Sequence, residues 1–310
     1  MFCTIKFQRN NCSQILKNFK PRFSSSVAAT EKECYISIPK PGVATINLNR
    51  PKSKNALSKN LLIELRRSIN QIRDDPDVRV VILNSNVDKV FCAGADLKER
   101  ITMTPLEVSQ FLTNLKETFI ELENLPVATI AALDGAALGG GLELALCCDL
   151  RVSGEKTILG LVETSLGIIP GAGGTQRITN LVGPSKAKEL IYTSARLNAQ
   201  QAHVYGIIND YINSSENSIS RTGFNASSNN PIKNFETGYE LALEWAERIS
   251  QMGPLAIKMA KRAINMGFES DIKTGLEIEQ LCYDRVINTE DRLEGLRAFK
   301  EKRVPVYKGK

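Results

Sequence analysis

The stretch that most constrains this chain runs from Asp134 to Cys148 and reads Asp-Gly-Ala-Ala-Leu-Gly-Gly-Gly-Leu-Glu-Leu-Ala-Leu-Cys-Cys. Its three consecutive glycines, 139–141, let the backbone approach another group closely, and the residues that follow are good helix formers. A helix that begins there would direct free backbone N–H groups at whatever lies in front of it. Glu143 stands inside this apolar run, and its burial is unfavourable unless it has a partner or a task. The stretch is therefore either a structural glycine-rich turn or part of a functional site.

The composition is that of a globular protein, with 310 residues of which 42% are hydrophobic. Such a chain can bury one large core, or one core with a smaller appendage. No run of 18 apolar residues occurs, so we predict no transmembrane helix and no membrane partner. The seven cysteines are odd in number and irregular in spacing, which favours reduced thiols and predicts no metal site. The single histidine, His203, lies in an amphipathic pattern that favours a structural role.

The positive charge of the chain is concentrated at its beginning. The whole chain has a formal net charge of +6. Residues 1–30 contain five basic residues and no acidic one, so the rest of the chain has 35 basic and 34 acidic residues. The near-neutral body gives no general argument for nucleic-acid or membrane binding. The leader is basic, contains serines, and has scattered rather than clustered apolar residues, as a mitochondrial transit peptide does. We therefore expect residues 1–30 to be a transit peptide and the protein to be mitochondrial.

The hydrophobic pattern predicts strands and helices in repeated ββα-like units. Strands are expected at 35–38, 43–48, 78–83, 128–133 and 150–152. Ser58 is a plausible cap for a helix, and Thr104-Pro105-Leu106-Glu107 is a capping box that opens another. Small-residue turns between strands and helices then collect at one edge of the sheets, where ligands usually bind.

A second glycine cluster, 171–174, repeats the first in its context. It precedes a helix, and an acid, Glu163, lies just upstream among apolar residues. Further helices are expected at 185–194 and 198–205, and then at 235–251, 255–266, 272–287 and 290–302. The interval 213–233 is dominated by Asn and Ser and is predicted to be a flexible surface insertion. The expected organisation is a transit peptide (1–30), a ββα core (31–212), the insertion (213–233) and a helical C-terminal region (234–310).

These motifs, in this order, resemble those of the crotonase, or enoyl-CoA hydratase, superfamily from about residue 34 to residue 310. The matching pieces include Glu163 and, in chain order, Asn49-Arg50-Pro51, Asn55-Ala56-Leu57, Phe91-x-Ala93-Gly94-Ala95-Asp96-Leu97-Lys98, Gly135-x-Ala137-x-Gly139-Gly140-Gly141-x-Glu143, Pro170-Gly171-Ala172-Gly173-Gly174-Thr175-Gln176-Arg177 and Leu293-Glu294-Gly295. Further details are similar to the mitochondrial methylglutaconyl-CoA hydratases that also bind AU-rich RNA, and to the mitochondrial enoyl-CoA hydratase domain-containing proteins. The resemblance implies an α/β fold, a crotonase-type spiral of ββα units with a C-terminal helical region for trimerisation.

The resemblance also implies a reaction, the hydration of a short or branched trans-2-enoyl-CoA. The backbone N–H groups of Ala95 and Gly140 would form an oxyanion hole for the thioester oxygen. Glu143 and Glu163 would act as general acid and base around one water molecule. The family's usual view makes the residue at Glu163 the proton donor at C2 and the residue at Glu143 the activator of water, and the sequence leaves that division open. Retention of both acids favours hydration over isomerisation.

The substrate contacts implied by the resemblance come from two parts of the chain. They are Ala93, Ala95, Asp96, Leu97, Lys98, Gly140 and Gly171 and, from the tail, Phe299 and Lys302. The tail residues are expected to serve a neighbouring subunit in a homotrimer or hexamer. No separate cofactor is expected, because coenzyme A is part of the substrate.

Two other functions stay open at this point. The basic helix 54–73 matches the segment that carries RNA binding in the AU-rich RNA-binding relatives, although it has no interleaved aromatic residues. A catalytically inactive scaffold of the same fold is the other alternative. Which acyl group is preferred, among straight-chain, branched and carboxylated ones such as 3-methylglutaconyl, is not readable from the sequence.

Overall fold

In the computed structural model, residues 32–213 and 235–310 are described, and they belong to one unit, Lys32–Lys310. The predicted transit peptide 1–30, and all of the predicted insertion 213–233 except its first residue, lie outside the described residues.

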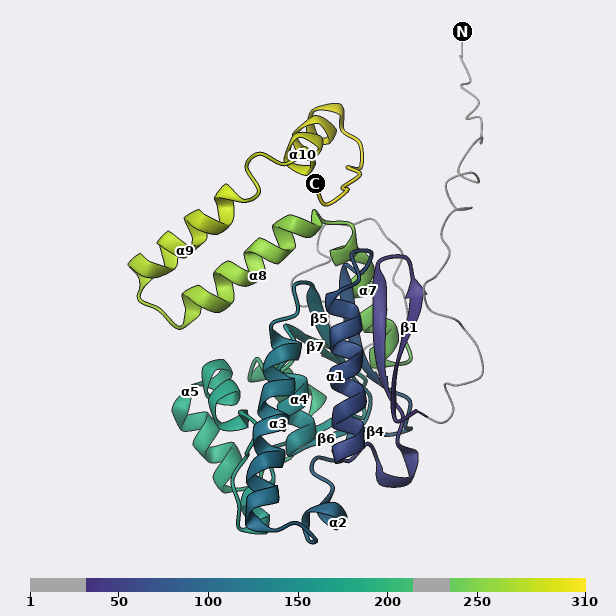
Figure 1. Ribbon diagram of the computed structural model, residues 1–310, viewed down its shortest axis with the longest axis vertical. Helices are drawn as coiled ribbons and strands as arrows, with labels where there is room; N and C mark the ends of the chain where they lie inside the picture. The colour runs from purple at the N-terminus through teal and green to yellow at the C-terminus, as the bar shows by residue number, and fades with distance from the viewer. Residues whose placement is uncertain (1–31, 214–234) are drawn as a thin grey trace. The chain divides into compact units, whose positions relative to one another are not determined.

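The larger sheet has six strands in the order β1-β2-β3-β5-β7-β10 (Figure 1). These are Cys34–Lys40, Val43–Leu48, Val80–Ser85, Ala128–Leu133, Leu150–Ser153 and Asp210–Tyr211. β1 and β2, which contain the strands expected at 35–38 and 43–48, form an antiparallel hairpin, and β2, β3, β5, β7 and β10 run parallel. All residues of β2 and β5 are buried, because helices cover both faces of a parallel sheet.

The smaller sheet has four strands in the order β4-β6-β8-β9. They are Val90–Cys92, Ala136–Leu138, Ile158–Gly160 and Leu197–Asn198, of which the first three run parallel. Each of β4, β6 and β8 comes directly after a strand of the larger sheet and leads into a helix or a helical turn. The chain therefore winds as a spiral of ββα units, which confirms the predicted fold class.

The helices between the strands cover the core. They are α1 (Lys59–Arg73), α2 (Leu97–Arg100), α3 (Pro105–Glu123), α4 (Gly140–Leu146), α5 (Gly174–Tyr192) and α6 (Ala199–Val204), with 3-10 turns η3 (Pro51–Ser53) and η4 (Glu163–Leu166). Ser58 caps α1 as predicted, accepting a hydrogen bond from Leu61 N at 3.1 Å, and the capping box at Thr104 opens α3. α5 contains a kink at Gly183, where the helix expected at 185–194 continues from an earlier segment.

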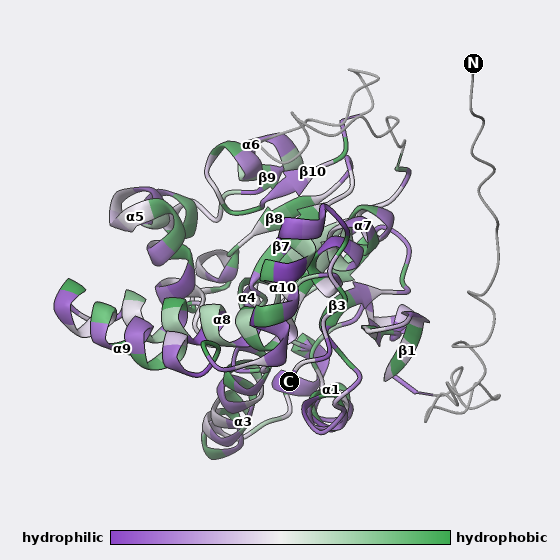
Figure 2. Ribbon diagram, turned by 90° about the horizontal axis from the view of Figure 1, so that it is seen from above, coloured by the Kyte–Doolittle hydropathy of each residue, from purple (hydrophilic) through white to green (hydrophobic). Residues whose placement is uncertain are grey.

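Four helices end the chain: α7 (Gly238–Ser250), α8 (Pro254–Phe268), α9 (Ile272–Asp284) and α10 (Glu290–Glu301). α7 packs its buried residues Leu241, Ala242 and Ala246 against the larger sheet. α8 and α9 lie side by side as a hairpin (Figure 1), and only Met259 and Cys282 of these two helices are buried. Hydrophobic residues are nevertheless spread along α8 and α9 (Figure 2), so this region exposes apolar side chains in the single chain.

Candidate active site

The site lies at the carboxyl ends of the three parallel strands of the smaller sheet. β4 leads into the turn 93–95, β6 leads into Gly139 and Gly140, and β8 is followed after two residues by Glu163. Neighbouring parallel strands end at the same edge of a sheet, so residues far apart in sequence meet there. A hydrogen bond from Gly139 N to Gly160 O, 2.8 Å long, joins the second and third of these segments.

The backbone N–H groups of Ala95 and Gly140 lie at this edge and have no acceptor among the described residues. Gly140 is the first residue of α4, so its N–H has no partner within the helix. On either side of Ala95, Leu57 N donates to Gly94 O at 2.8 Å and Asp96 N donates to Leu57 O at 3.3 Å, which leaves the N–H of Ala95 free. The two N–H groups are close together, because a Cβ built on Gly140 would lie 3.7 Å from Ala95 N. They form a ready pair of donors for one oxygen atom.

Glycine is required at two positions of this arrangement. Gly94 has φ +95°, and a Cβ built there would lie 2.7 Å from Leu138 O and 3.3 Å from Gly140 N. Gly139 has φ +52°, and its Cβ would lie 3.1 Å from Glu163 Oε1. A side chain at either position would be strained and would crowd the donor pair or the acid.

Glu143 projects from the first turn of α4 and is 2% exposed. Its Oε1 accepts hydrogen bonds from Ala172 N and Gly174 N, both 2.8 Å long. Burial raises the pKa of Glu143, while these two hydrogen bonds oppose the shift by stabilising the carboxylate. The second glycine cluster therefore holds this side chain in place through its backbone.

Glu163 begins η4, is 8% exposed, and faces the same region without comparable support. Neither of its carboxyl oxygens has a hydrogen-bond partner within the described structure. Burial raises the pKa of Glu163 to about 7, and the nearby charge of Glu143 adds to the effect. At neutral pH this carboxyl group is thus divided between its protonated and ionised forms, as suits a group that exchanges a proton with a substrate.

Both acids and both N–H donors line one cavity of about 1040 Å³. Its walls also contain three of the other residues that the resemblance implied as substrate contacts, Ala93, Leu97 and Gly171. Apolar side chains of α3, among them Leu112 and Leu115, form another part of the wall. The structure thus brings together the predicted acids, the predicted donors and an apolar chamber large enough for an acyl group.

Four other predicted contact residues do not line this cavity: Asp96, Lys98, Phe299 and Lys302. Both carboxyl oxygens of Asp96 are engaged, Oδ1 by the N–H groups of Lys98 and Glu99 and Oδ2 by Arg50. Lys98 is exposed on α2, and Phe299 is 87% exposed on α10 with Lys302 directly after that helix. Contacts of these residues with coenzyme A stay predictions.

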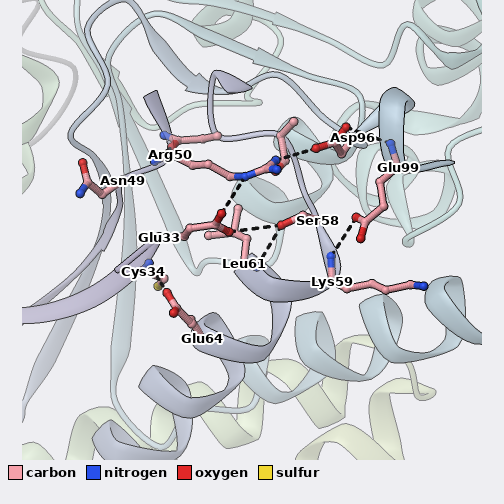
Figure 3. Close-up of polar contacts among 12 residues, drawn as sticks. Glu33, Cys34, Asn49, Arg50, Ser58, Lys59, Leu61, Glu64, Asp96 and Glu99 are labelled. Carbon is pink, nitrogen blue, oxygen red and sulfur yellow. Dashed lines mark hydrogen bonds and ion pairs between the residues drawn. The ribbon is translucent and has the colours of Figure 1, made fainter. Parts of the chain in front are cut away.

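Arg50 supports the site, although in the sequence it is identified only as part of a motif. Its Nη1 donates to Asp96 Oδ2 at 2.7 Å and to Ala56 O at 2.9 Å, and its Nε donates to Glu33 Oε1 at 3.0 Å (Figure 3). Burial alone would raise the pKa of Asp96, but hydrogen bonds from Arg50 and from the first turn of α2 outweigh it and lower the pKa. Asp96, the residue next to Ala95, is therefore held in place by Arg50, which lies in the segment that follows β2.

The other candidates for chemistry lie elsewhere. His203 packs against the ring of Tyr211, with 5.4 Å between ring centroids, and does not line the cavity. The cysteines of the described segments are buried, free thiols.

On the basic helix α1, Arg66 forms ion pairs with Glu117 at 3.1 Å and Glu121 at 3.0 Å of α3, which neutralise part of the surface considered for RNA. No helix in the described parts of the chain is long and apolar enough to cross a membrane.

Comparison with known proteins places this geometry in context. The sequence matches the family described as enoyl-CoA hydratase/isomerase over residues 39–221 and 235–310. It is 48% identical over 268 residues to the probable enoyl-CoA hydratase 2, mitochondrial, of Arabidopsis thaliana, covering 86% of this chain and 82% of that protein. It is 46% identical to the mitochondrial methylglutaconyl-CoA hydratase of Mus musculus, covering 86% and 80%. The crystal structure of an enoyl-CoA hydratase from Bacillus anthracis superposes with a TM-score of 0.81 at 44% identity, covering 90% of this chain and all of that one.

Proposed function

Since the chain belongs to the enoyl-CoA hydratase/isomerase family, we propose that it is an enoyl-CoA hydratase, which adds water across the 2,3-double bond of a trans-2-enoyl-CoA thioester. One observation carries the proposal. Two buried acids, Glu143 and Glu163, line the same cavity as the N–H groups of Ala95 and Gly140, which have no hydrogen-bond acceptor in the described structure. An isomerase needs to move one proton between two carbons, whereas hydration needs two groups to handle the water and the substrate together.

The paired N–H groups would hold the thioester oxygen. In the proposed mechanism both donors, on Ala95 and Gly140, shorten their hydrogen bonds as negative charge develops on that oxygen in the enolate-like transition state. Donors of this kind are each worth about 3 kcal/mol in the transition state, because they are fixed before the reaction begins. The rigidity comes from Gly94 and Gly139, whose positive φ angles shape the two turns.

The two acids would divide the proton transfers. Glu143, whose Oε1 accepts hydrogen bonds from Ala172 N and Gly174 N, takes one proton from the water molecule while the oxygen of that water bonds to C3. Glu163, whose pKa is about 7, gives a proton to C2. The double bond is lost, the water supplies OH at C3, and C2 receives its hydrogen. The hydrogen bonds from Ala172 N and Gly174 N favour the carboxylate form of Glu143, and the pKa of about 7 favours a protonated Glu163, which supports this division of roles with Glu163 as the acid in the direction of hydration.

The substrate proposal is a short or branched enoyl-CoA. Relatives named methylglutaconyl-CoA hydratase and probable enoyl-CoA hydratase support this proposal, and the proposed setting is leucine breakdown or fatty acid β-oxidation. No separate cofactor is proposed, because coenzyme A enters as part of the substrate. Several relatives are named mitochondrial, and together with the basic leader this supports a location in the mitochondrial matrix.

We further propose that the chain works as a homotrimer or a dimer of trimers. Large apolar side chains are exposed along the last three helices, where an isolated chain would leave them in water. They include Ile264, Phe268, Ile272, Leu276, Leu281, Leu293, Leu296 and Phe299. Association through this surface would also bring the exposed Phe299 and Lys302 toward a neighbouring subunit. Sedimentation equilibrium of the purified protein tests the assembly.

Loss of the enoyl absorbance of crotonyl-CoA, followed with purified protein, tests the activity. Formation of 3-hydroxybutyryl-CoA supports the proposal. Formation of a double-bond isomer without the hydroxy product, or no reaction with any short enoyl-CoA, would contradict it.

A further inference from the structure

The two acids of the site are supported in different ways. Glu143 is held through its own carboxyl group, whose Oε1 accepts hydrogen bonds from Ala172 N and Gly174 N, both 2.8 Å long. Neither carboxyl oxygen of Glu163 has a hydrogen-bond partner in the described structure, so the position of this acid depends on the backbone that carries it. That backbone is the first residue of η4, a 3-10 turn of four residues. Because 3-10 hydrogen bonds are poorly aligned, such a turn gives weak support by itself.

A pair of hydroxyl groups joins η4 to the end of α5. Thr164, the second residue of η4, donates from Oγ1 to Ile191 O at 2.5 Å, and its Oγ1 lies 2.8 Å from Ser194 Oγ. Because the single hydroxyl proton of Thr164 is given to Ile191 O, Ser194 is the donor within the pair. The alternative acceptor for Ser194, Val162 O, is farther away at 3.4 Å. Ser194 Oγ also accepts a hydrogen bond from Ser165 N at 3.1 Å, so one side chain binds two consecutive residues of η4.

Ser194 adopts a backbone conformation that glycine normally occupies. It follows Thr193, the C-cap of α5, and its φ angle is +50°, in the left-handed region. Glycine is the usual residue at this position after a helix, because a Cβ atom makes the conformation unfavourable. A serine is strained here, but it supplies a hydroxyl group that glycine lacks. Strain of this kind is found where a side chain has a task, and the hydrogen bonds of Ser194 indicate that the task is to hold η4.

The same helix therefore supports both acids, one from each end. At the beginning of α5, Gly174 N bonds to the carboxyl group of Glu143. At its end, Ser194 and its partner Thr164 hold the turn that carries Glu163. Neither Ser194 nor Thr164 lines the active-site cavity, so any effect of these residues on the reaction is exerted through Glu163.

We propose that Ser194 and Thr164 are positioning residues of the hydration reaction, which hold Glu163 at the distance and orientation that proton transfer to C2 requires. The inference rests on the proposed hydratase function and adds to it two residues that do not touch the substrate. Loss of either hydroxyl group leaves Glu163 chemically intact but frees its turn. Proton transfer needs the donor within hydrogen-bond reach, so kcat falls, while binding of the thioester through the N–H groups of Ala95 and Gly140 is kept.

The test measures crotonyl-CoA hydration by Ser194→Gly. Glycine removes the hydroxyl group and also relieves the strain after α5, so a loss of activity does not follow from a weakened helix end. We expect kcat to fall about 10-fold with KM nearly unchanged, a part of the roughly 100-fold that a displacement of about 1 Å can cost. Thr164→Val should show a similar loss, and Thr164→Ser, which keeps the hydroxyl group, should recover most of it. Thr193→Ala is the matched control, because Thr193 Oγ1 bonds at 2.7 Å to Glu189 O of its own helix.

A double-mutant cycle separates positioning from a general structural role. In the Glu163→Gln background no acid remains to be positioned, so Ser194→Gly should have no further effect on kcat. Should Ser194→Gly fail to fold, Thr164→Val takes its place in the cycle. An unchanged kcat in the variant used, equal fold losses in both backgrounds, or the same loss in Thr193→Ala would overturn the proposal.

Urea unfolding keeps this inference separate from the proposed activity. Burial of the Glu163 carboxylate is unfavourable at pH 8, so Glu163→Gln is expected to stabilise the folded protein there. When Ser194→Gly frees the turn, the carboxylate reaches water, and the stabilisation by Glu163→Gln at pH 8 should become smaller. An unchanged stabilisation in that background would contradict the proposal, whether or not the protein hydrates crotonyl-CoA. A smaller one in a protein without hydratase activity would contradict the hydratase function alone.

Discussion

Arg50 Nη1 lies 2.7 Å from Asp96 Oδ2, which ties the segment after β2 to the residue next to the Ala95 donor (Figure 3). The same carboxylate caps α2 through the N–H groups of Lys98 and Glu99. The position of Ala95 N thus depends on a side chain 45 residues earlier in the chain. Arg50 has no contact with the cavity and acts through Asp96, as a positioning residue.

Replacement of Arg50 by Ala is predicted to lower kcat by about 10- to 100-fold with a smaller change in KM. The change leaves the Asp96 carboxylate buried without its partner and lets the donor turn shift, and small displacements of a reacting group can cost about 100-fold in rate. Steady-state kinetics with crotonyl-CoA measure the split between kcat and KM. Arg50→Lys should recover part of kcat because the charge is retained.

Arg66→Ala is the matched control for this prediction. It breaks ion pairs of similar length with Glu117 and Glu121, but these join α1 to α3 at the surface. Turnover of Arg66→Ala should equal that of wild type. Equal losses of activity and stability in the two variants would mean that Arg50 has only a general structural role.

The rate of hydration is predicted to fall as the pH rises above about 7. Burial raises the pKa of Glu163 to about 7, and the proposed mechanism needs this group protonated to supply C2. The apparent values belong to the pair of acids, because the charge of Glu143 influences the titration of Glu163. The pH dependence of kcat/KM for crotonyl-CoA checks this. A rate that increases steadily from pH 6 to pH 9 would contradict the role of Glu163 as the acid.

Glu163→Gln is predicted to be more stable than wild type at pH 8, by up to about 3 kcal/mol. The pKa of Glu163 is about 7 in the folded protein against an ordinary value of 4.5, so the folded state binds this proton more tightly than the unfolded state. The contribution of Glu163 to the free energy of unfolding is therefore fully present below pH 4.5 and is lost as the pH rises through 7. Urea unfolding should give a gap between the variants that closes toward pH 4.5.

Glu107→Gln should show the opposite sign and controls for the loss of a charge as such. Hydrogen bonds from Thr104 hold the pKa of Glu107 below its ordinary value, so its carboxylate stabilises the protein above that range. Glu107→Gln should be less stable than wild type at pH 8. A Glu163→Gln protein that is also less stable at pH 8 would argue against the burial of an uncompensated charge.

The parts of the fold that local patterns control were predictable from the sequence. The strand 128–133 and the caps at Ser58 and Thr104 agree with the structure, because hydrophobic period and cap chemistry act over a few residues. The pairing of the two glycine turns with Glu163 needed the motif resemblance, since no local signal shows which strands become neighbours.

The role of Arg50 could not be predicted from the sequence for a different reason. Its partner Asp96 lies far along the chain, and the two side chains meet only when the spiral of ββα units has closed. In the sequence Arg50 is one arginine among many charged residues, and its spacing from Asp96 does not mark the pair.

The central claim, that Glu143 and Glu163 are the acid and base of a hydratase, is tested most directly by crotonyl-CoA turnover in Glu143→Gln and Glu163→Gln. Each variant is predicted to lose about 10²- to 10⁴-fold in kcat, because glutamine keeps the shape of the side chain but cannot transfer the proton. Both should still bind a CoA thioester with an affinity near that of wild type, since the N–H groups of Ala95 and Gly140 remain. Full activity in either variant, with unchanged binding, would contradict the account.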